Sequence, residues 1–213
     1  MGTIMNVCLV WHTSSIKTID DAKKRDVLVS SGSNVAGSDS VFPVILNDVL
    51  GTKFKVISGY RGSPEANLAL ERGEVEGRCG FGWNAIKAST NWIKEGKIHV
   101  ILQMGMKKDA DLPEVPLIMD LVSDPKQRSA LEFLLGSSVM ARPFLAPPGI
   151  PPERLKLLRE AFDGALRDPE LRAQGDHQNL DIDPVGGAEM EALLVKLYAT
   201  PQSIIEPTKA WLK

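Results

Sequence analysis

Small and hydroxyl-bearing residues follow a predicted strand near the start of the chain. Residues 27–29 are apolar and β-rich, and the loop after them contains Ser31, Gly32, Ser33 and Asn34. Glycine lets a ligand approach the backbone closely, and a serine hydroxyl can donate a hydrogen bond to a carboxylate oxygen. This loop is a candidate binding site for an organic anion. The alternative is a loop that only caps the helix after it.

A second junction of this kind combines an aromatic residue, a cation and a glycine. After the strand predicted at residues 54–57 come Tyr60, Arg61, Gly62 and Ser63. Arg61 could hold a carboxylate through two parallel hydrogen bonds. Ser63 is also a natural helix N-cap with proline at the first helical position. The alternative is therefore an exposed arginine beside a serine that serves only the helix.

The third junction follows the strand predicted at residues 76–81 and contains Gly82, Trp83 and Asn84. Trp83 could form the apolar wall of a pocket and Asn84 could donate a hydrogen bond, or Trp83 could simply fill the core. A fourth candidate, Arg142, lies in the apolar segment 139–146. Because a charge in apolar surroundings is costly unless it is paired, Arg142 either faces a ligand or forms a salt bridge.

The elements that carry these junctions alternate in type over the first half of the chain. Strands are predicted at residues 5–11, 27–29, 54–57, 76–81 and 98–104, and helices at residues 63–73 and 83–95 lie between the later ones. Alternation of this kind predicts parallel pairing with helical crossovers. Ligands of open α/β sheets lie outside the carboxyl ends of the strands, where helix N-termini favour anions.

The last third of the chain has helical patterns but few strands. Residues from Glu153 form an amphipathic helix whose apolar stripe is Leu155, Leu158, Phe162 and Leu166, and a further helix is predicted at 188–199. These apolar faces must pack on something. They either cover the sheet already described or belong to a second sheet that is mostly absent from this chain.

Composition excludes several functional classes. The chain has 213 residues, a net charge of -2 and 24% charged residues, so its bulk charge does not favour nucleic acid or an anionic membrane. No apolar run approaches the roughly 20 residues of a membrane helix, and the N-terminus lacks the basic region of a secretory signal. The three histidines are scattered, and neither a metal nor a cofactor is expected.

The two cysteines, Cys8 and Cys79, form no motif. The simplest interpretation is two small buried apolar side chains. A disulfide between them is a second possibility. A catalytic thiol at Cys79 is a third, although no Ser/His/Asp or Cys/His pairing is evident in the sequence.

Four segments together resemble one family, the receptors of tripartite tricarboxylate transporters, which are periplasmic binding proteins of the TctC or Bug type. They are SSGSNVAGS, GYRGSPEANLALERGEVEG, LPEVPLIMDL and PFLAPPGIPPERLKLLREAFDGALRDPELR. The resemblance implies an α/β clamshell with hinge crossings at residues 5–12 and 138–146. Residues 12–138 would form one complete parallel α/β lobe, and residues 1–11 and 139–213 would form hinge segments and the helical part of a second, N-terminally truncated lobe.

The resemblance also implies a function without chemistry. The chain would bind a small organic carboxylate and deliver it to the membrane components of the transporter, in the periplasm if the full-length product carries an upstream signal. The missing signal leaves an intracellular ligand-sensing domain open, and Cys79 leaves a cysteine-dependent enzyme open. Unpartnered helix faces further predict a homo-oligomer that buries Leu155, Leu158, Phe162 and Leu194.

Overall fold

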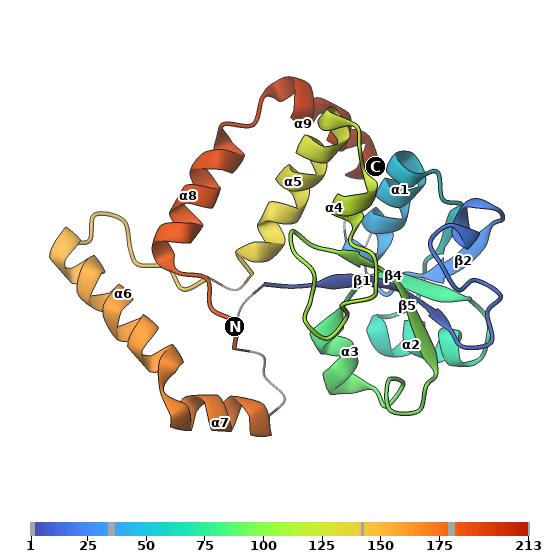
Figure 1. Ribbon diagram of the computed structural model, residues 1–213, viewed down its shortest axis with the longest axis horizontal. Coiled ribbons are helices and arrows are strands. Elements are labelled where there is room, and N and C mark those ends of the chain that lie inside the picture. Colours follow the sequence, from blue (N-terminus) through green and yellow to red (C-terminus); the bar gives the residue numbers. More distant parts are fainter. Residues whose placement is uncertain (1–2, 34–36, 142, 179–181, 213) are drawn as a thin grey trace.

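The computed structural model describes residues 3–33, 37–141, 143–178 and 182–212. Its centre is a five-stranded sheet of order β3-β2-β4-β1-β5 (Figure 1). The strands are β1 (Asn6–Trp11), β2 (Val27–Ser30), β3 (Phe54–Ile57), β4 (Gly77–Gly82) and β5 (Ile98–Met104). The helices are α1 (Ser38–Leu50), α2 (Ser63–Glu71), α3 (Trp83–Ser89), α4 (Ile118–Leu121), α5 (Pro125–Val139), α6 (Pro152–Arg167), α7 (Pro169–His177), α8 (Gly187–Tyr198) and α9 (Gln202–Thr208), with short 3-10 turns η1 (Asp21–Lys23) and η2 (Lys209–Leu212).

The sheet is mixed, which corrects the expectation of parallel pairing throughout. Strand β2 pairs in parallel with β3 and β4, as alternation of strands and helices predicts. Strand β1 instead runs antiparallel to both β4 and β5. Antiparallel neighbours need no helical crossover between them, so the alternation of strands and helices does not fix the direction of β1. It enters from the side of α5, where the Ile4 N–H donates to the Ser138 carbonyl at 2.9 Å.

Apolar side chains alternate along β1 and supply two cores, one on each face of the sheet. Cys8 and Val10 point into the core covered by α1, α5 and η2, whereas Val7 and Leu9 point into the core covered by α2 and α3. All four side chains are fully buried. The central strand is therefore apolar on both faces, as in sheets that are covered by helices on each side.

Cys8 and Cys79 stand opposite each other in the register of β1 and β4, and they form a disulfide. Both residues are completely buried. Burial was the simplest expectation from the sequence, but the pairing of two cysteines 71 residues apart was only the second possibility. A buried and bonded Cys79 offers no thiolate, which removes the motive for a cysteine-dependent enzyme.

Two predicted boundaries change in the structure. Helix α3 ends at Ser89 rather than near Glu95, because Thr90 is extended with φ −138° and its N–H and hydroxyl both bond back to the Ile86 carbonyl. Helix α5 continues to Val139, so the apolar segment after it is shorter than expected. Phe144 and Leu145 in that segment are 70% and 86% exposed.

The C-terminal third forms an arm and then returns to the sheet. Figure 1 shows α6 and α7 projecting away from the sheet, while α8 runs beside α5. Helix α9 and η2 pack on α5 and α1, where Trp211 is buried and its indole N–H donates to Asp48 Oδ2 at 2.9 Å. Helix α7 was not expected as a separate element. Its N-cap is Asp168, whose carboxylate accepts from the N–H groups of residues 170 and 171. Within the described ranges no helix has the length and apolar character needed to cross a membrane.

Candidate functional site

Three strand-to-helix junctions meet at one edge of the sheet because β2, β3 and β4 are parallel. The loop after β2 touches the first turn of α2, since a Cβ atom added to Gly32 would lie 2.5 Å from the Gly62 carbonyl carbon. Within β4, the Gly80 carbonyl accepts from the Ser38 hydroxyl at the start of α1 at 2.8 Å. The fold therefore places the first two candidate segments in contact, and the third follows a neighbouring strand at the same edge.

Asp39, the second residue of α1, organises the loop after β2. Its carboxylate accepts from the Gly32 N–H at 2.8 Å, from the Ser31 hydroxyl at 3.0 Å and from the Ser33 hydroxyl. The residue is only 5% exposed. Nothing in the sequence singled out Asp39, because an acidic residue in the first turn of a helix is common on stability grounds alone.

Arg78, from β4, is the counter-ion of Asp39. Its Nη2 lies 3.1 Å from Asp39 Oδ2, and its side chain is 1% exposed. The guanidinium also donates to Asn67 Oδ1 at 2.5 Å and to the Ser63 hydroxyl at 3.4 Å, and it lies 4.0 Å above the centre of the Phe81 ring. Among the described residues its Nε finds no hydrogen-bond acceptor. Arg78 thus links α1 to α2 directly, and it links the β2 loop to both helices through Asp39.

The pair is held in its charged form. Burial alone would raise the pKa of Asp39, but the hydrogen bonds from Ser33, Gly32 and Ser31 and the charge of Arg78 outweigh burial and lower that pKa. Burial lowers the pKa of Arg78, and Asp39 opposes this effect. Since arginine stays protonated in proteins, the edge of the sheet contains a complete internal ion pair at neutral pH.

At the second junction the predicted residues lie at the surface. The Arg61 side chain is 90% exposed and lies 3.9 Å from Glu65. Gly62 has φ +99°, a conformation that favours glycine, and Ser63 is the first residue of α2. The Arg61 backbone N–H donates to Glu65 Oε2 at 2.7 Å, so a carboxylate of α2 pairs this N–H group of the turn. Arg61 therefore keeps a guanidinium free to meet solvent or a solute.

At the third junction Trp83 lies mainly in the core. It is 5% exposed, packs with the apolar residues beneath α2 and α3, and donates its indole N–H to Asp111 Oδ2 at 3.3 Å. Lys87 holds the same carboxylate oxygen at 2.7 Å and lowers the Asp111 pKa. Gly82 is the N-cap of α3, and Asn84 is half-buried next to it. Two other predicted site residues, Asn34 and Arg142, lie outside the described residues.

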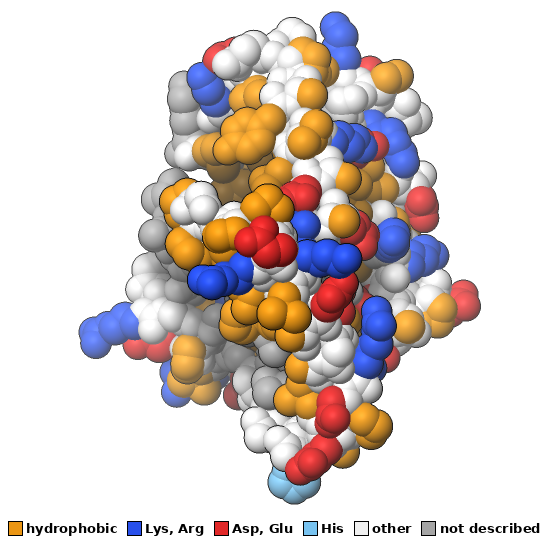
Figure 2. Space-filling model, turned by 90° about the vertical axis from the view of Figure 1, so that its left-hand side faces the viewer, with side chains coloured by type: hydrophobic (Ala, Val, Ile, Leu, Met, Phe, Trp, Pro, Cys, Tyr) orange, Lys and Arg blue, Asp and Glu red, His pale blue; other side chains and the backbone are white. Residues whose placement is uncertain are grey.

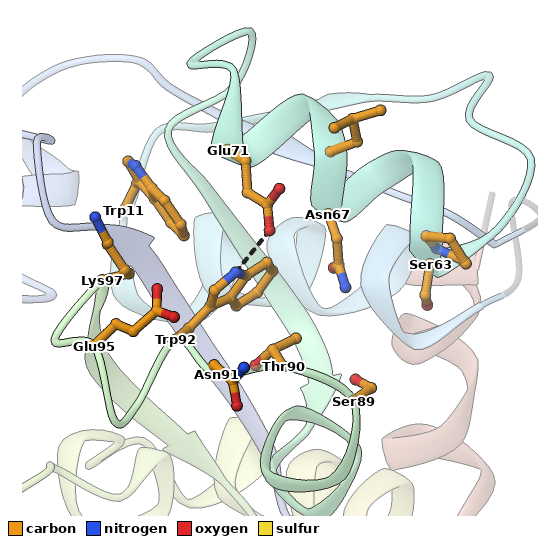
Figure 3. A pocket seen from close by; sticks show the side chains of 12 residues that line it. Trp11, Ser63, Asn67, Glu71, Ser89, Thr90, Asn91, Trp92, Glu95 and Lys97 are labelled. Carbon is orange, nitrogen blue, oxygen red and sulfur yellow. Dashed lines mark hydrogen bonds between the residues drawn. The ribbon is translucent and has the colours of Figure 1, made fainter.

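A hollow of about 770 Å³ runs along α2 from Ser63 toward the far end of the sheet. Figure 3 shows Asn67 and Glu71 on one of its walls and the segment of Ser89, Thr90 and Asn91 on the other. Trp92 lies between these walls and donates its indole N–H to Glu71 Oε1 at 2.8 Å. Sequence analysis marked only Ser63 among the residues that line this hollow, because its walls come from three segments that are far apart in the chain.

Comparison with known proteins identifies the family. The family model described as tripartite tricarboxylate transporter family receptor matches residues 13–199. The chain belongs to this family. Its members are periplasmic solute-binding receptors rather than enzymes, which confirms the resemblance found in the sequence. No match was found among the curated proteins.

Several solved structures share the fold of this chain. A TctC solute-binding protein from Polaromonas has a TM-score of 0.68 and 19% identity, and the alignment covers 97% of this chain and 67% of that one. MatC from Rhodopseudomonas palustris with bound malate has a TM-score of 0.52 and 16% identity, and the alignment covers 100% of this chain and 67% of MatC. An R. palustris protein with adipate has a TM-score of 0.60 and 13% identity, and the alignment covers 100% of this chain and 66% of that protein. The chain thus spans about two thirds of the length of these proteins, and the predicted fold class is confirmed.

Proposed function

We propose that this chain binds a small organic carboxylate at the edge where the three junctions meet, as the receptor, or part of the receptor, of a tripartite tricarboxylate-type transporter. The observation that carries the proposal is the contact between the β2 loop and the first turn of α2, beside the exposed cation of Arg61. Free N–H groups in the first turns of α1 and α2 add partial positive charge at the same edge. These features give the proposed site a net attraction for an anion.

The proposed site uses the residues that the sequence marked. Arg61, Gly62 and Ser63 face the solute with a guanidinium, a backbone that permits close approach and a hydroxyl. The β2 loop with Ser31, Gly32 and Ser33 forms the adjoining wall, and Gly82, Trp83, Asn84 and Tyr60 limit its size. Two neighbours of the fold were solved with adipate and with malate, so dicarboxylates are the first solutes to try.

The proposal extends to the architecture and the partners. Residues 12–138 act as the complete lobe of a clamshell, and residues 1–11 and 139–213 supply hinge segments and part of the other lobe. The Ile4–Ser138 hydrogen bond supports this division, because it joins the two segments that would cross the hinge. The membrane components of the transporter are the proposed partners, in the periplasm. Because a clamshell draws contacts from both lobes, this chain alone binds its solute weakly.

Apolar side chains on the C-terminal arm support association with a second copy of the chain. Leu158 is 51% exposed, and Val195 and Tyr198 on α8 are 70% and 88% exposed. Figure 2, which faces this side of the molecule, shows such side chains in groups between charged ones. Phe162 packs against Phe144 with tilted rings whose centres are 5.0 Å apart, which adds an aromatic pair near the same stripe. Self-association through α6 and α8 removes this surface from water.

A ligand screen by thermal unfolding tests the function. The panel consists of dicarboxylates, aromatic acids and amino acids, each paired with its neutral amide. A ligand at about 100 times its Kd raises stability by about 2.7 kcal/mol, which corresponds to roughly 5–11 °C for a domain of this size. A shift with one acid and none with its amide supports the proposal. Equal shifts of the thermal midpoint for an acid and its amide contradict the proposal. A midpoint that no ligand of the panel changes, in a chain that supplies both lobes, also contradicts it.

A further inference from the structure

The groups that were expected to receive a solute carboxylate on the β2 loop are already bonded to a carboxylate of the protein. The hydroxyls of Ser31 and Ser33 and the N–H of Gly32 all donate to Asp39. They form a cradle of two hydroxyls and one amide around one anion. The same cradle holds the ion pair with Arg78 at 3.1 Å beneath it.

We infer that Asp39 is a built-in anion that permanently occupies the cradle of the β2 loop, with Arg78 as its counter-ion. The inference rests on the proposed function in one respect, namely that a solute binds at this edge. It assigns the solute carboxylate to Arg61 and the first turn of α2 and excludes it from the β2 loop. Asp39 and Arg78 are thus positioning residues that determine which end of the site receives the solute anion.

Charge and burial both favour this assignment. A second carboxylate in contact with Asp39 would place two like charges in one site, where they cannot both ionise at neutral pH. Asp39 is also buried, and its Oδ2 already accepts from both Gly32 and Arg78. An incoming carboxylate would have to displace an internal group that is held at high effective concentration. The Arg61 side chain is 90% exposed and lies 3.9 Å from the half-exposed Glu65, so an external carboxylate can reach its guanidinium without displacing a buried group.

Contact between Gly32 and Gly62 lets Asp39 affect the position of the turn that precedes α2, where the solute is proposed to bind. The Gly32 N–H is fixed by Asp39 at 2.8 Å, and its Cα faces the Gly62 carbonyl so closely that no side chain fits. Arg78 reaches Ser63 from the other side at 3.4 Å. The ion pair therefore sets the position of the turn that receives the solute, although neither residue touches the solute.

Chemical rescue of Asp39→Ala tests the inference without knowledge of the solute. Removing the carboxylate leaves Arg78 unpaired and the cradle empty, which lowers the thermal midpoint by roughly 6–20 °C. Formate reproduces the lost group in size and charge, so a formate titration should raise the midpoint of the variant, or refold it, in a saturable manner. Equal concentrations of chloride control for ionic strength. The wild type should show no response beyond that control.

A double variant locates the response. Asp39→Ala combined with Arg78→Met removes both charges, so it should fold and show no formate response. Absence of a formate gain in Asp39→Ala, folded or unfolded in plain buffer, overturns the inference. These outcomes do not depend on a solute, whereas the proposed function fails only through the ligand screen, so the two failures are distinguishable.

A measurement on the wild type covers the case in which Asp39→Ala cannot be recovered. The amide ¹⁵N–¹H resonance of Gly32 should not shift when formate is added, because Asp39 occupies its acceptor position. Once a solute is known, a saturable change at the Arg61 side chain should accompany binding. A saturable formate shift at Gly32 in the wild type would show that the cradle is open to external anions, and it would overturn the inference.

Discussion

The ion pair between Asp39 and Arg78 allows a quantitative prediction about stability. The two charges are 3.1 Å apart with side-chain exposures of 7% and 1%. At an effective dielectric constant of about 20, their gross attraction is about 5 kcal/mol, which desolvation largely offsets. We expect Arg78→Met alone to destabilise the fold by about 3–5 kcal/mol, because it leaves Asp39 charged and buried. We expect the Asp39→Ala and Arg78→Met double variant to lose much less than the sum of the single losses.

Urea unfolding of the four proteins in this double-mutant cycle measures the coupling. The expected coupling energy is at least about 2 kcal/mol, within the range for residues in direct contact. The exposed pair of Lys196 and Glu132, 2.8 Å apart, is the matched control and should couple by less than about 1 kcal/mol. Additive losses at Asp39 and Arg78 would refute the reasoning, because they would mean that neither charge needs the other.

The same pair predicts an acid limb in the stability curve. The pKa of Asp39 is lowered in the folded protein, so its contribution is present above the unfolded value of about 4 and is lost as pH falls through the folded value. Arg78→Met removes one cause of the lowered pKa, so we expect a smaller loss of stability in that window. Thermal midpoints between about pH 5 and pH 2 measure it. A steeper acid loss in Arg78→Met than in the wild type would contradict this explanation.

Three further predictions concern the solute turn, the glycine contact and the apolar arm. Arg61→Gln should weaken solute binding about tenfold or more in calorimetry, whereas Arg72→Gln, at the other end of α2, should leave it unchanged. Gly32→Ala should cost about 1–3 kcal/mol because its Cβ meets the Gly62 carbonyl, while Gly164→Ala, with open space around it, should be neutral or stabilising. Leu158→Asp should lower the mass seen in light scattering, and a monomeric wild type would refute self-association.

The sequence predicted the elements better than their pairing. Apolar runs located all five strands, and the Ser63-Pro64 cap located the start of α2, because hydrophobic patterning and capping residues act locally. It did not reveal that β1 runs antiparallel between β4 and β5, since periodicity contains no information about direction. It also overextended α3, where the residues after Ser89 have helical composition but form turns.

For the candidate site, too, the sequence predicted the segments but not the contacts between them. The sequence marked the three loops that meet at the edge, because glycine and serine after a strand indicate close backbone approach. It could not show that Asp39 would use the hydroxyls of one loop, because Asp39 and Arg78 are 39 residues apart and meet only through the order of the strands. The sequence did mark the loop as an anion site, and in the structure the anion bound there belongs to the protein itself.

An ion pair is not the simplest way to hold two elements together, and this bears on what Asp39 and Arg78 do. Well-packed apolar residues of similar volume generally stabilise a fold as much as a buried ion pair, or more. What an apolar pair cannot do is orient the Gly32 N–H and the two serine hydroxyls, or reach Asn67 and Ser63 from the same guanidinium. The distinguishing contribution of the pair is therefore geometric. It fixes the β2 loop against α2, and in the proposed site it leaves the exposed Arg61 as the cation for an external carboxylate.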